Sequence, residues 1–201
     1  MRNLKWISGL AVAVMLAAVN VTAQEKAPAF ELTDVHGNTH SLAQYEGKII
    51  VLEWINYDCP FVRKFYRPGY MQKWQEKYTG KGIVWLSICS SAPGTQGHFS
   101  IDEWHRRIND QKVKATAVLL DEDGTVGRAY GARTTPHMYV IDKEGNLVYK
   151  GGIDDRRSTN SAHVEGARNF VIEALDALLA GNPVAASDAP PYGCSVKYAN
   201  E

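Results

Sequence analysis

The stretch Lys48-Ile-Ile-Val-Leu-Glu-Trp-Ile-Asn-Tyr-Asp-Cys-Pro-Phe-Val62 decides the fold of this chain. Its apolar run, residues 49–55, is typical of a strand that is covered on both faces. Asn-Tyr-Asp then forms a short turn, and Cys59 stands directly before Pro60. Proline suits the first turn of a helix, because the N–H that it lacks would have no partner there. The stretch therefore predicts a buried strand, a turn and a helix that begins at a cysteine.

A cysteine at the start of a helix has reason to be reactive. The free N–H groups there carry partial positive charge, which favours the thiolate over the thiol. Arg63 lies one turn further along the same helix face, with Lys64 beside it; both cations favour the anion, whereas Asp58 opposes it. We interpret Cys59 as a reactive thiol; the alternative is an inert, buried cysteine.

Composition limits the classes of function. The 201 residues include 22 Lys and Arg and 22 Asp and Glu, so the net charge is zero and nothing in the charge balance favours nucleic acid as a partner. A chain of this length has room for one domain with a sizeable core.

The N-terminal segment, residues 1–23, has the pattern of a secretory signal. Met1–Lys5 is basic, residues 6–21 are mostly apolar, and Val21-Thr-Ala23 offers a small-x-small cleavage site. The apolar run is short for a membrane-spanning helix. We expect a cleaved signal and a mature protein in an oxidising compartment, the bacterial periplasm. An uncleaved signal is the alternative, and it would be the only membrane attachment.

Apolar strand patterns alternate with helical patterns along the rest of the chain, which predicts an α/β fold with a mixed sheet. Gly181-Asn182-Pro183 ends the last helix. We therefore predict a domain over residues 24–181 and a flexible Pro/Ala-rich tail over residues 182–201. Strands are expected over residues 30–35, 49–55, 82–89, 116–120, 137–142 and 147–150, and helices over residues 59–80 (kinked at 67–69), 101–110, 126–130 and 164–179.

Three motifs in this order resemble the thioredoxin-like superfamily: Cys-Pro at a helix start, Tyr130-Gly-x-x-x-Thr-Pro136 and Asp142-x-x-Gly-x-Leu-Val-Tyr149. The resemblance covers roughly residues 30–179 and lies nearest to the secreted redoxins of the peroxiredoxin and TlpA/ResA neighbourhood. Gly193-Cys-Ser-Val-Lys-Tyr198 resembles a C-terminal element of one branch of redoxin-domain proteins. The resemblance implies a thioredoxin-like fold with a C-terminal tail.

The resemblance also implies roles for single residues. Cys59 matches the nucleophilic cysteine, and Pro136 matches a cis-proline that faces it. Thr135, before that proline, would offer backbone hydrogen bonds to an incoming peptide. Glu53 matches a buried acid whose raised pKa lets it accept the thiol proton; the alternative is an acid on a solvated strand face. Arg133 could offer the thiolate a cation.

Two family patterns are incomplete in this chain. Val62 stands where Cys-x-x-Cys proteins carry the second thiol, so a local disulfide cannot form. Leu52 and Asn56 replace the proline and threonine with which peroxiredoxins bind and polarise peroxide. The peroxide-binding pattern is therefore missing, but the sequence does not separate disulfide exchange from peroxide reduction.

A single nucleophilic thiol needs a second thiol to release the mixed disulfide or sulfenic acid that it forms. The chain offers two candidates, Cys89 and Cys194, and three cysteines in a secreted chain imply a free or exchanging thiol. Cys89 lies in an apolar strand, where cysteines are usually packed core residues. Cys194 lies on the tail, which can reach across the domain. We expect Cys194 to resolve Cys59; the alternatives are a structural role or a bond to another molecule.

Two hypotheses of function follow. The first is a periplasmic thiol-dependent oxidoreductase without a cofactor, which acts on a protein disulfide or a peroxide and is regenerated by an external thiol. The second is a non-catalytic binding module, or a copper-handling protein similar to Sco, in which His137 would join Cys59 and Cys194. The scattered histidines His98, His105 and His163 are expected at the surface.

Overall fold

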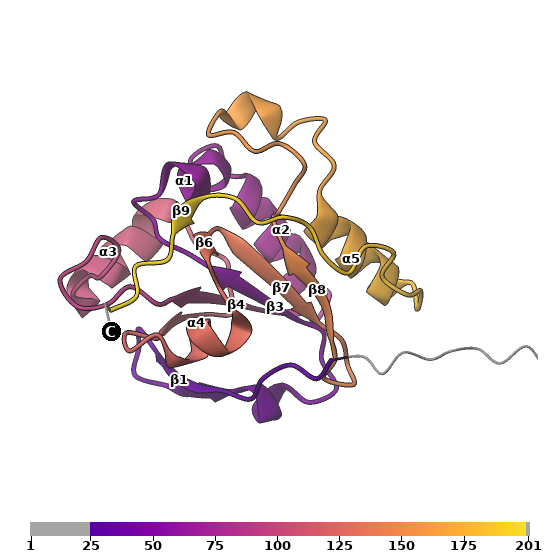
Figure 1. The fold of residues 1–201 in the computed structure, drawn as a ribbon, viewed down its shortest axis with the longest axis horizontal. Coiled ribbons are helices and arrows are strands. Elements are labelled where there is room, and N and C mark those ends of the chain that lie inside the picture. Colours follow the sequence, from indigo (N-terminus) through magenta and orange to yellow (C-terminus); the bar gives the residue numbers. More distant parts are fainter. Residues whose placement is uncertain (1–24, 200–201) are drawn as a thin grey trace, which may run out of the picture.

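The computed structural model describes residues 25–199, so the predicted signal segment lies outside the described residues. The main sheet consists of β1 (Glu31–Asp34), β2 (Thr39–Ser41), β3 (Ile50–Trp54), β4 (Val84–Cys89), β5 (Ala117–Leu120), β7 (His137–Ile141) and β8 (Leu147–Gly151). Its strand order is β2-β1-β5-β4-β3-β7-β8 (Figure 1). β3 runs parallel to β4, and β4 to β5, whereas the other neighbours are antiparallel. The predicted mixed sheet is therefore present.

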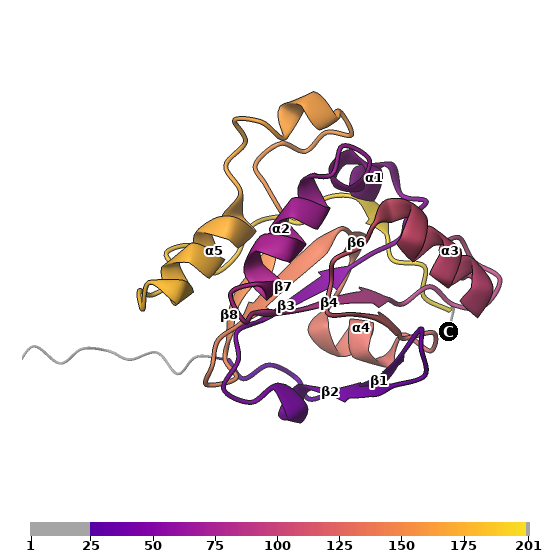
Figure 2. The ribbon, with the colours of Figure 1, turned by 180° about the vertical axis from the view of Figure 1, so that it is seen from behind.

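Helices cover both faces of this sheet. Figure 2 shows α2 and α3 in front of the sheet and α4 behind it. The helices of the described residues are α1 (Pro60–Tyr66), α2 (Tyr70–Thr79), α3 (Ile101–Gln111), α4 (Thr125–Tyr130) and α5 (Phe170–Leu179), with short 3₁₀ turns η1 (Leu42–Tyr45) and η2 (Ser161–His163). Within residues 25–199, no helix combines the length and apolar character needed to cross a bilayer.

Strand β3 contributes side chains to the core on both sides of the sheet, because both of its faces are buried. Val51 and Ile55 belong to a cluster with residues of α1, α2 and α5, whereas Ile50 and Leu52 belong to the cluster on the α4 side. Strand alternation places Glu53 on the same side as Val51. The acid therefore points into the interior layer between the sheet and the helices α1 and α2.

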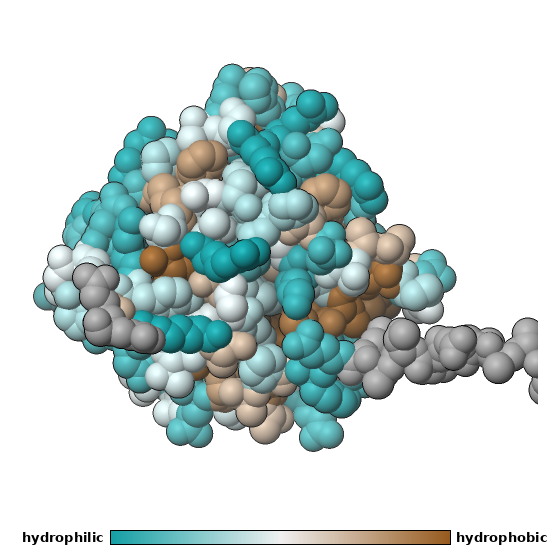
Figure 3. Space-filling view, viewed as in Figure 1, coloured by the Kyte–Doolittle hydropathy of each residue, from teal (hydrophilic) through white to brown (hydrophobic). Residues whose placement is uncertain are grey.

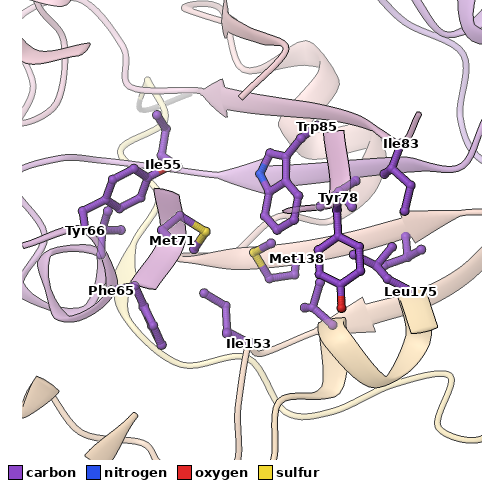
Figure 4. Packing of buried hydrophobic residues seen from close by; sticks show 14 of the residues in the cluster. Ile55, Phe65, Tyr66, Met71, Tyr78, Ile83, Trp85, Met138, Ile153 and Leu175 are labelled. Atoms are coloured by element: carbon purple, nitrogen blue, oxygen red, sulfur yellow. The ribbon is translucent and has the colours of Figure 1, made fainter. Parts of the chain in front are cut away.

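Aromatic and sulfur-containing side chains fill that layer. Figure 4 shows Trp85 and Met138 of the sheet facing Tyr78 of α2 and Leu175 of α5. All four side chains are at most 1% exposed. This packing anchors α2 against β4 and so holds the site end of β3 in place.

Two predicted helices have different limits in the structure. The expected kink near residues 67–69 is a break between α1 and α2, because Gly69 adopts φ 86° and starts α2 afresh. The last helix begins at Phe170 rather than at residue 164. Asn169 accepts the Ile172 N–H at 3.0 Å and caps the helix there.

The segment after α5 is not the loose tail that its composition predicts. Lys150 of β8 donates its N–H to Ser187 O at 3.0 Å and accepts the Ala189 N–H at 3.2 Å. Further on, β9 (Cys194–Ser195) pairs with β6 (Thr134–Thr135) in a second, two-stranded sheet that the sequence patterns do not predict. In Figure 1 the yellow C-terminal segment accordingly crosses the molecule from β8 towards α1.

Candidate active site

Cys59 stands where β3 leads into α1. It is the N-cap residue of α1, and its N–H bonds to Asn56 O at 2.9 Å across the turn. Its carbonyl accepts N–H groups of the first helical turn, from Val62 at 3.1 Å and Arg63 at 3.0 Å. The side chain is 0% exposed, and its Sγ lies 3.1 Å from Thr135 O. The predicted strand–turn–helix is thus present, with the thiol at the helix start.

The thiol of Cys194 lies against the thiol of Cys59. Thr135 precedes a cis peptide bond to Pro136, as the resemblance implied. In the antiparallel β6–β9 pair, Thr135 stands directly opposite Cys194. The two Sγ atoms are 2.6 Å apart, and both cysteines are free thiols. The tail therefore brings a second thiol to the position that Val62 leaves without one.

A glycine permits this close approach. Gly193 has φ 142°, and a Cβ atom built there would lie 2.1 Å from Thr135 O. On the other side of Cys194, the N–H of Val196 donates to Arg133 O at 3.1 Å. The backbone of β6 thus holds the tail on both sides of the cysteine.

Tyr192 anchors the tail before this point. Its hydroxyl donates to Asp154 and accepts a hydrogen bond from Lys64 Nζ at 3.1 Å. Lys64 Nζ also pairs with Asp154 Oδ2 at 2.8 Å, and both of these side chains are almost completely buried. A buried ion pair is costly unless its remaining hydrogen-bonding capacity is satisfied, which Tyr192 does here.

Tyr198 anchors the tail beyond the cysteine. Its hydroxyl donates to Ala132 O at 2.8 Å. Its ring packs over α4, where a Cβ atom at Gly124 or Gly127 would lie within 2.5 Å of the tyrosine. Between the two tyrosines, Lys197 O accepts the Ala92 N–H at 2.8 Å. The element Gly193–Tyr198 is therefore seated along its whole length.

The contact between the two thiols shifts their pKa values in opposite directions. Burial alone would raise the pKa of Cys59, but hydrogen bonds that involve the Cys194 thiol, Thr135 and the backbone N–H of Val62 lower it below the usual value. Burial, the hydrogen bond to Cys59 and the charge of that thiolate together raise the pKa of Cys194. Of the two thiols, Cys59 therefore ionises first, and Cys194 keeps its proton to higher pH.

The cations expected to favour this thiolate are engaged elsewhere. Arg63 donates to Asp58 at 2.8 Å and to Tyr57 O at 2.9 Å, and Lys64 is paired with Asp154. The prediction that Arg63 and Lys64 act on Cys59 is therefore not supported by their contacts. Stabilisation of the anion comes from short-range hydrogen bonds and the helix start instead.

A model of one protein family matches residues 23–150, which is more than half of the chain; its description is the AhpC/TSA family. The chain belongs to the AhpC/TSA family. The match ends before the tail, so Cys194 lies outside the part that the family model describes.

Two solved structures are similar to this AhpC/TSA chain over nearly its whole length. An uncharacterised conserved protein from Geobacillus kaustophilus is 29% identical, covers 94% of this chain and 100% of its own, and has a TM-score of 0.77. A hypothetical protein from Sinorhizobium meliloti 1021 is 26% identical, covers 91% and 98%, and has a TM-score of 0.75. At such coverage the matches must include most of residues 151–201. The predicted thioredoxin-like redoxin fold is confirmed.

Among curated proteins, the thiol-disulfide oxidoreductase ResA of Geobacillus kaustophilus (strain HTA426) is 27% identical over 122 residues. That alignment covers 60% of this chain and 64% of ResA. The AhpC/TSA chain thus matches a little under two thirds of the length of this relative.

Glu53 of this AhpC/TSA protein is enclosed between the sheet and the helices α1 and α2. The side chain is 0% exposed, so the alternative of an acid on a solvated strand face is wrong. Burial raises its pKa from 4.5 to about 7, although four hydrogen bonds oppose the rise. Its partners are Trp85 Nε1 at 2.8 Å, the Tyr66 hydroxyl at 3.1 Å, and the Gln75 amide and Ser87 hydroxyl at 3.2 Å. None of these bonds leads directly to Cys59.

We expect Glu53→Gln to change how stability depends on pH. Because the pKa of Glu53 is higher in the folded state, its contribution is fully present below pH 4.5 and is lost as the pH rises through about 7. The substitution removes this loss. Between pH 4.5 and about 7, the free energy of unfolding of the variant should therefore rise by about 3 kcal/mol relative to that of the wild type. Urea unfolding at both ends of the range measures it. The exposed Glu46→Gln is the control, and an equal pH profile for Glu53→Gln and the wild type contradicts the prediction.

The remaining predicted residues lie apart from the thiol pair. Cys89 is buried in β4, where its thiol contacts Gly97 O at 3.5 Å and burial raises its pKa. His137 is buried, and its Nδ1 accepts the Arg133 N–H at 3.3 Å. Arg133 contributes its backbone to tail docking, and its exposed side chain has no hydrogen bond to either thiol within residues 25–199. His105 is half-buried rather than on the surface, because Nε2 bonds to Val35 O at 2.9 Å.

Two features of the site have no counterpart in the sequence patterns. The Lys64–Asp154–Tyr192 cluster joins residues from α1, a loop and the tail, and neither spacing nor composition connects them. The β6–β9 pair is two residues long on each side, too short for a strand signal. The Gly193–Tyr198 element is the sequence feature that marks the docked part of the tail, but it does not indicate that β6 is the strand with which it pairs.

Proposed function

We propose that this chain is a periplasmic thiol–disulfide oxidoreductase that alternates between a Cys59/Cys194 dithiol and a disulfide joining the two. The observation that carries the proposal is the 2.6 Å approach of the two Sγ atoms. The ResA relatives, which are named thiol-disulfide oxidoreductases, support the class of reaction. Cys59 is the proposed nucleophile, and Cys194 takes the place of the second thiol of Cys-x-x-Cys proteins.

Exposure decides which sulfur an external thiol can reach. Cys59 is 0% exposed beneath Thr135 and Cys194, whereas Cys194 is partly exposed. In the oxidised protein, an external thiolate therefore attacks the Sγ of Cys194. The S–S bond breaks, its electron pair goes to Cys59, and a mixed disulfide remains on Cys194. Cys59 is the better leaving group because its pKa is the lower of the two.

A second external thiolate completes the reduction. It attacks the external sulfur of the mixed disulfide, forms an external disulfide and leaves Cys194, which takes up a proton. Two external thiols have then been oxidised and the protein disulfide reduced. Toward an external disulfide, Cys59 is the nucleophile: once residues 193–196 are displaced, its thiolate attacks one sulfur of the external disulfide, forms a mixed disulfide on Cys59 and releases the first external thiolate. Cys194 then loses its proton and attacks the Sγ of Cys59, which releases the second external thiolate and closes the Cys59–Cys194 bond.

Thr135 and Pro136 are the proposed peptide platform, and β9 occupies it in this structure. The backbone of Thr135 faces Cys194, so a protein substrate that pairs with Thr135 must first displace residues 193–196. Arg133 flanks the same platform and is proposed as a contact for the substrate.

Glu53 is the proposed proton acceptor. With a pKa of about 7 it exchanges protons near neutral pH.

Disulfide exchange is favoured over peroxide reduction because Asn56 donates its amide to Gln96 O at 3.2 Å and accepts the Asp58 N–H at 2.9 Å. Its polar groups thus hold the turn before Cys59, and Leu52 is buried in the sheet.

The test combines disulfide mapping with turnover. We expect mild oxidation of the mature protein to yield a Cys59–Cys194 bridge, and the reduced protein to reduce a model disulfide faster than hydrogen peroxide. Cys59→Ser should lose both properties, whereas Cys89→Ser should retain them. A dominant Cys59–Cys89 bridge, or thiols that all stay free, would overturn the proposal.

A further inference from the structure

A cleft lies on the α4 side of the sheet, and Thr134 of β6 is among the residues that line it. Its volume is about 680 Å³, within the usual range for sites that hold small molecules. Its floor and walls come from Tyr130, Arg133, His137, Tyr139 and Lys150. The tail segment Asp188–Pro191 forms the opposite wall. The cleft therefore exists in this form only while the tail is docked.

His137 presents a hydrogen-bond donor to this cleft. The residue is 4% exposed, and burial, together with the charges of Arg133 and Lys150, lowers its pKa to about 4. The ring is thus neutral at physiological pH. Nδ1 lies 3.3 Å from the Arg133 N–H and 3.0 Å from the Tyr139 hydroxyl; in the tautomer in which Nδ1 accepts, Nε2 carries the proton. The ring lines the cleft, and its two hydrogen bonds within residues 25–199 are both made at Nδ1.

The charges around this donor favour an anion. The guanidinium of Arg133 forms no ion pair within residues 25–199. The ammonium of Lys150 has one weak partner, Glu25 at 3.7 Å, and both side chains of that pair are more than half exposed. Asp188 is the single acid of the lining. In Figure 3, hydrophilic side chains lie over the middle of this face, between α4 and the tail.

We propose that this cleft binds a small carboxylate-bearing molecule, whose carboxylate is held by Arg133, Lys150 and the Nε2–H of His137. The guanidinium fork matches a carboxylate in geometry, and charge-assisted hydrogen bonds are the stronger kind. The rings of Tyr130 and Tyr139 supply an apolar wall for the body of the ligand. Residues 188–191 line the site as well.

Ligand binding and tail docking are linked because both need the same arrangement. A molecule that binds only when residues 188–191 are docked stabilises the docked state. It thereby keeps Cys194 against Cys59 and slows the displacement of β9. This consequence rests on the proposed function, whereas the binding itself does not.

Benzoate is the probe, and benzamide is its neutral counterpart. Calorimetric titration of the reduced full-length mature protein should detect benzoate but not benzamide. Arg133→Gln and Lys150→Gln should each weaken benzoate binding about tenfold, the effect of losing one charge-assisted bond. Arg157→Gln, which removes an exposed arginine outside the cleft, is the matched control and should bind like the wild type.

Three results would overturn the proposal. They are absence of benzoate binding, equal binding in Arg133→Gln, Lys150→Gln and Arg157→Gln, and inorganic phosphate binding as tightly as benzoate. Bound benzoate should also slow alkylation of Cys59 in the wild type, and unchanged alkylation contradicts the link to the tail. The binding measurement does not depend on turnover. It therefore tests the ligand proposal even if the redox proposal is wrong.

Discussion

Cys194→Ser is expected to end disulfide turnover while the acidity of Cys59 stays close to that of the wild type. Serine keeps a hydroxyl that can donate a hydrogen bond to the Cys59 thiolate. In the wild type, the Sγ of Cys194 that the hydroxyl replaces lies 2.6 Å from the Sγ of Cys59. It cannot form the S–S bond, so each Cys59 that reacts stops as a mixed disulfide. Well-oriented intramolecular reactions have effective molarities of about 10⁵ M or more, so we expect a fall in turnover of at least about 100-fold.

Cys194→Ala separates the redox role of Cys194 from its electrostatic one. Alanine removes the hydrogen bond that helps to lower the pKa of Cys59, so that pKa should rise. The rate of iodoacetamide alkylation as a function of pH measures this for both variants. Cys89→Ser is the control for a thiol outside the pair. Turnover by Cys194→Ser within about twofold of the wild type would remove Cys194 from the mechanism.

Gly193→Ala is expected to release the tail from β6. The new Cβ would lie 2.1 Å from Thr135 O and 2.7 Å from its carbonyl carbon, both backbone atoms that cannot rotate away. The tail must therefore leave its pairing with Thr135. Cys59 should become open to alkylation, and the Cys59–Cys194 bridge should become easier to reduce in a glutathione buffer. We expect a change of about 100-fold in both measurements, equivalent to about 3 kcal/mol of lost docking.

Gly181→Ala is the matched control for this variant. Gly181 also has a positive φ, 73°, but a Cβ atom there would meet no atom within 4 Å. Both variants therefore carry the backbone cost of alanine at positive φ, about 1 kcal/mol, and only one carries the clash. If the two variants show the same alkylation rate and the same reduction equilibrium, the tail is not held through Gly193.

The part of the site that could be predicted from sequence is local. The apolar run over residues 49–55, the turn and Pro60 specify β3, the N-terminus of α1 and the position of Cys59, because each depends on neighbours in the chain. Burial of Glu53 follows from the same run, in which both strand faces are apolar. The strand that follows Pro136 and its return through Asp142–Asn146 were predictable for the same reason.

The charges around Cys59 could not be predicted in this way. Lys64 is adjacent to Arg63 in sequence, but its carboxylate partner, Asp154, is 90 residues away. An ion pair inside the protein depends on which groups lose their water together, and spacing along a helix does not record this. The N-terminus of α5 could not be predicted from the apolar pattern, because that pattern continues upstream of Asn169. The cap at Asn169 decides where the helix begins.

Residue types and local pattern are enough to predict that Cys59 starts a helix, that Val62 stands where a local second thiol would be, and that Cys194 is a candidate partner 135 positions further along the chain. Those properties depend on residue type and local pattern. The meeting of Cys194 with Cys59 is visible only in the folded chain, because the two residues are 135 positions apart and the contact rests on many weak interactions. Pairing with β6, the seating of Tyr192 and Tyr198, and the close approach of Gly193 each act over a distance that no local pattern spans.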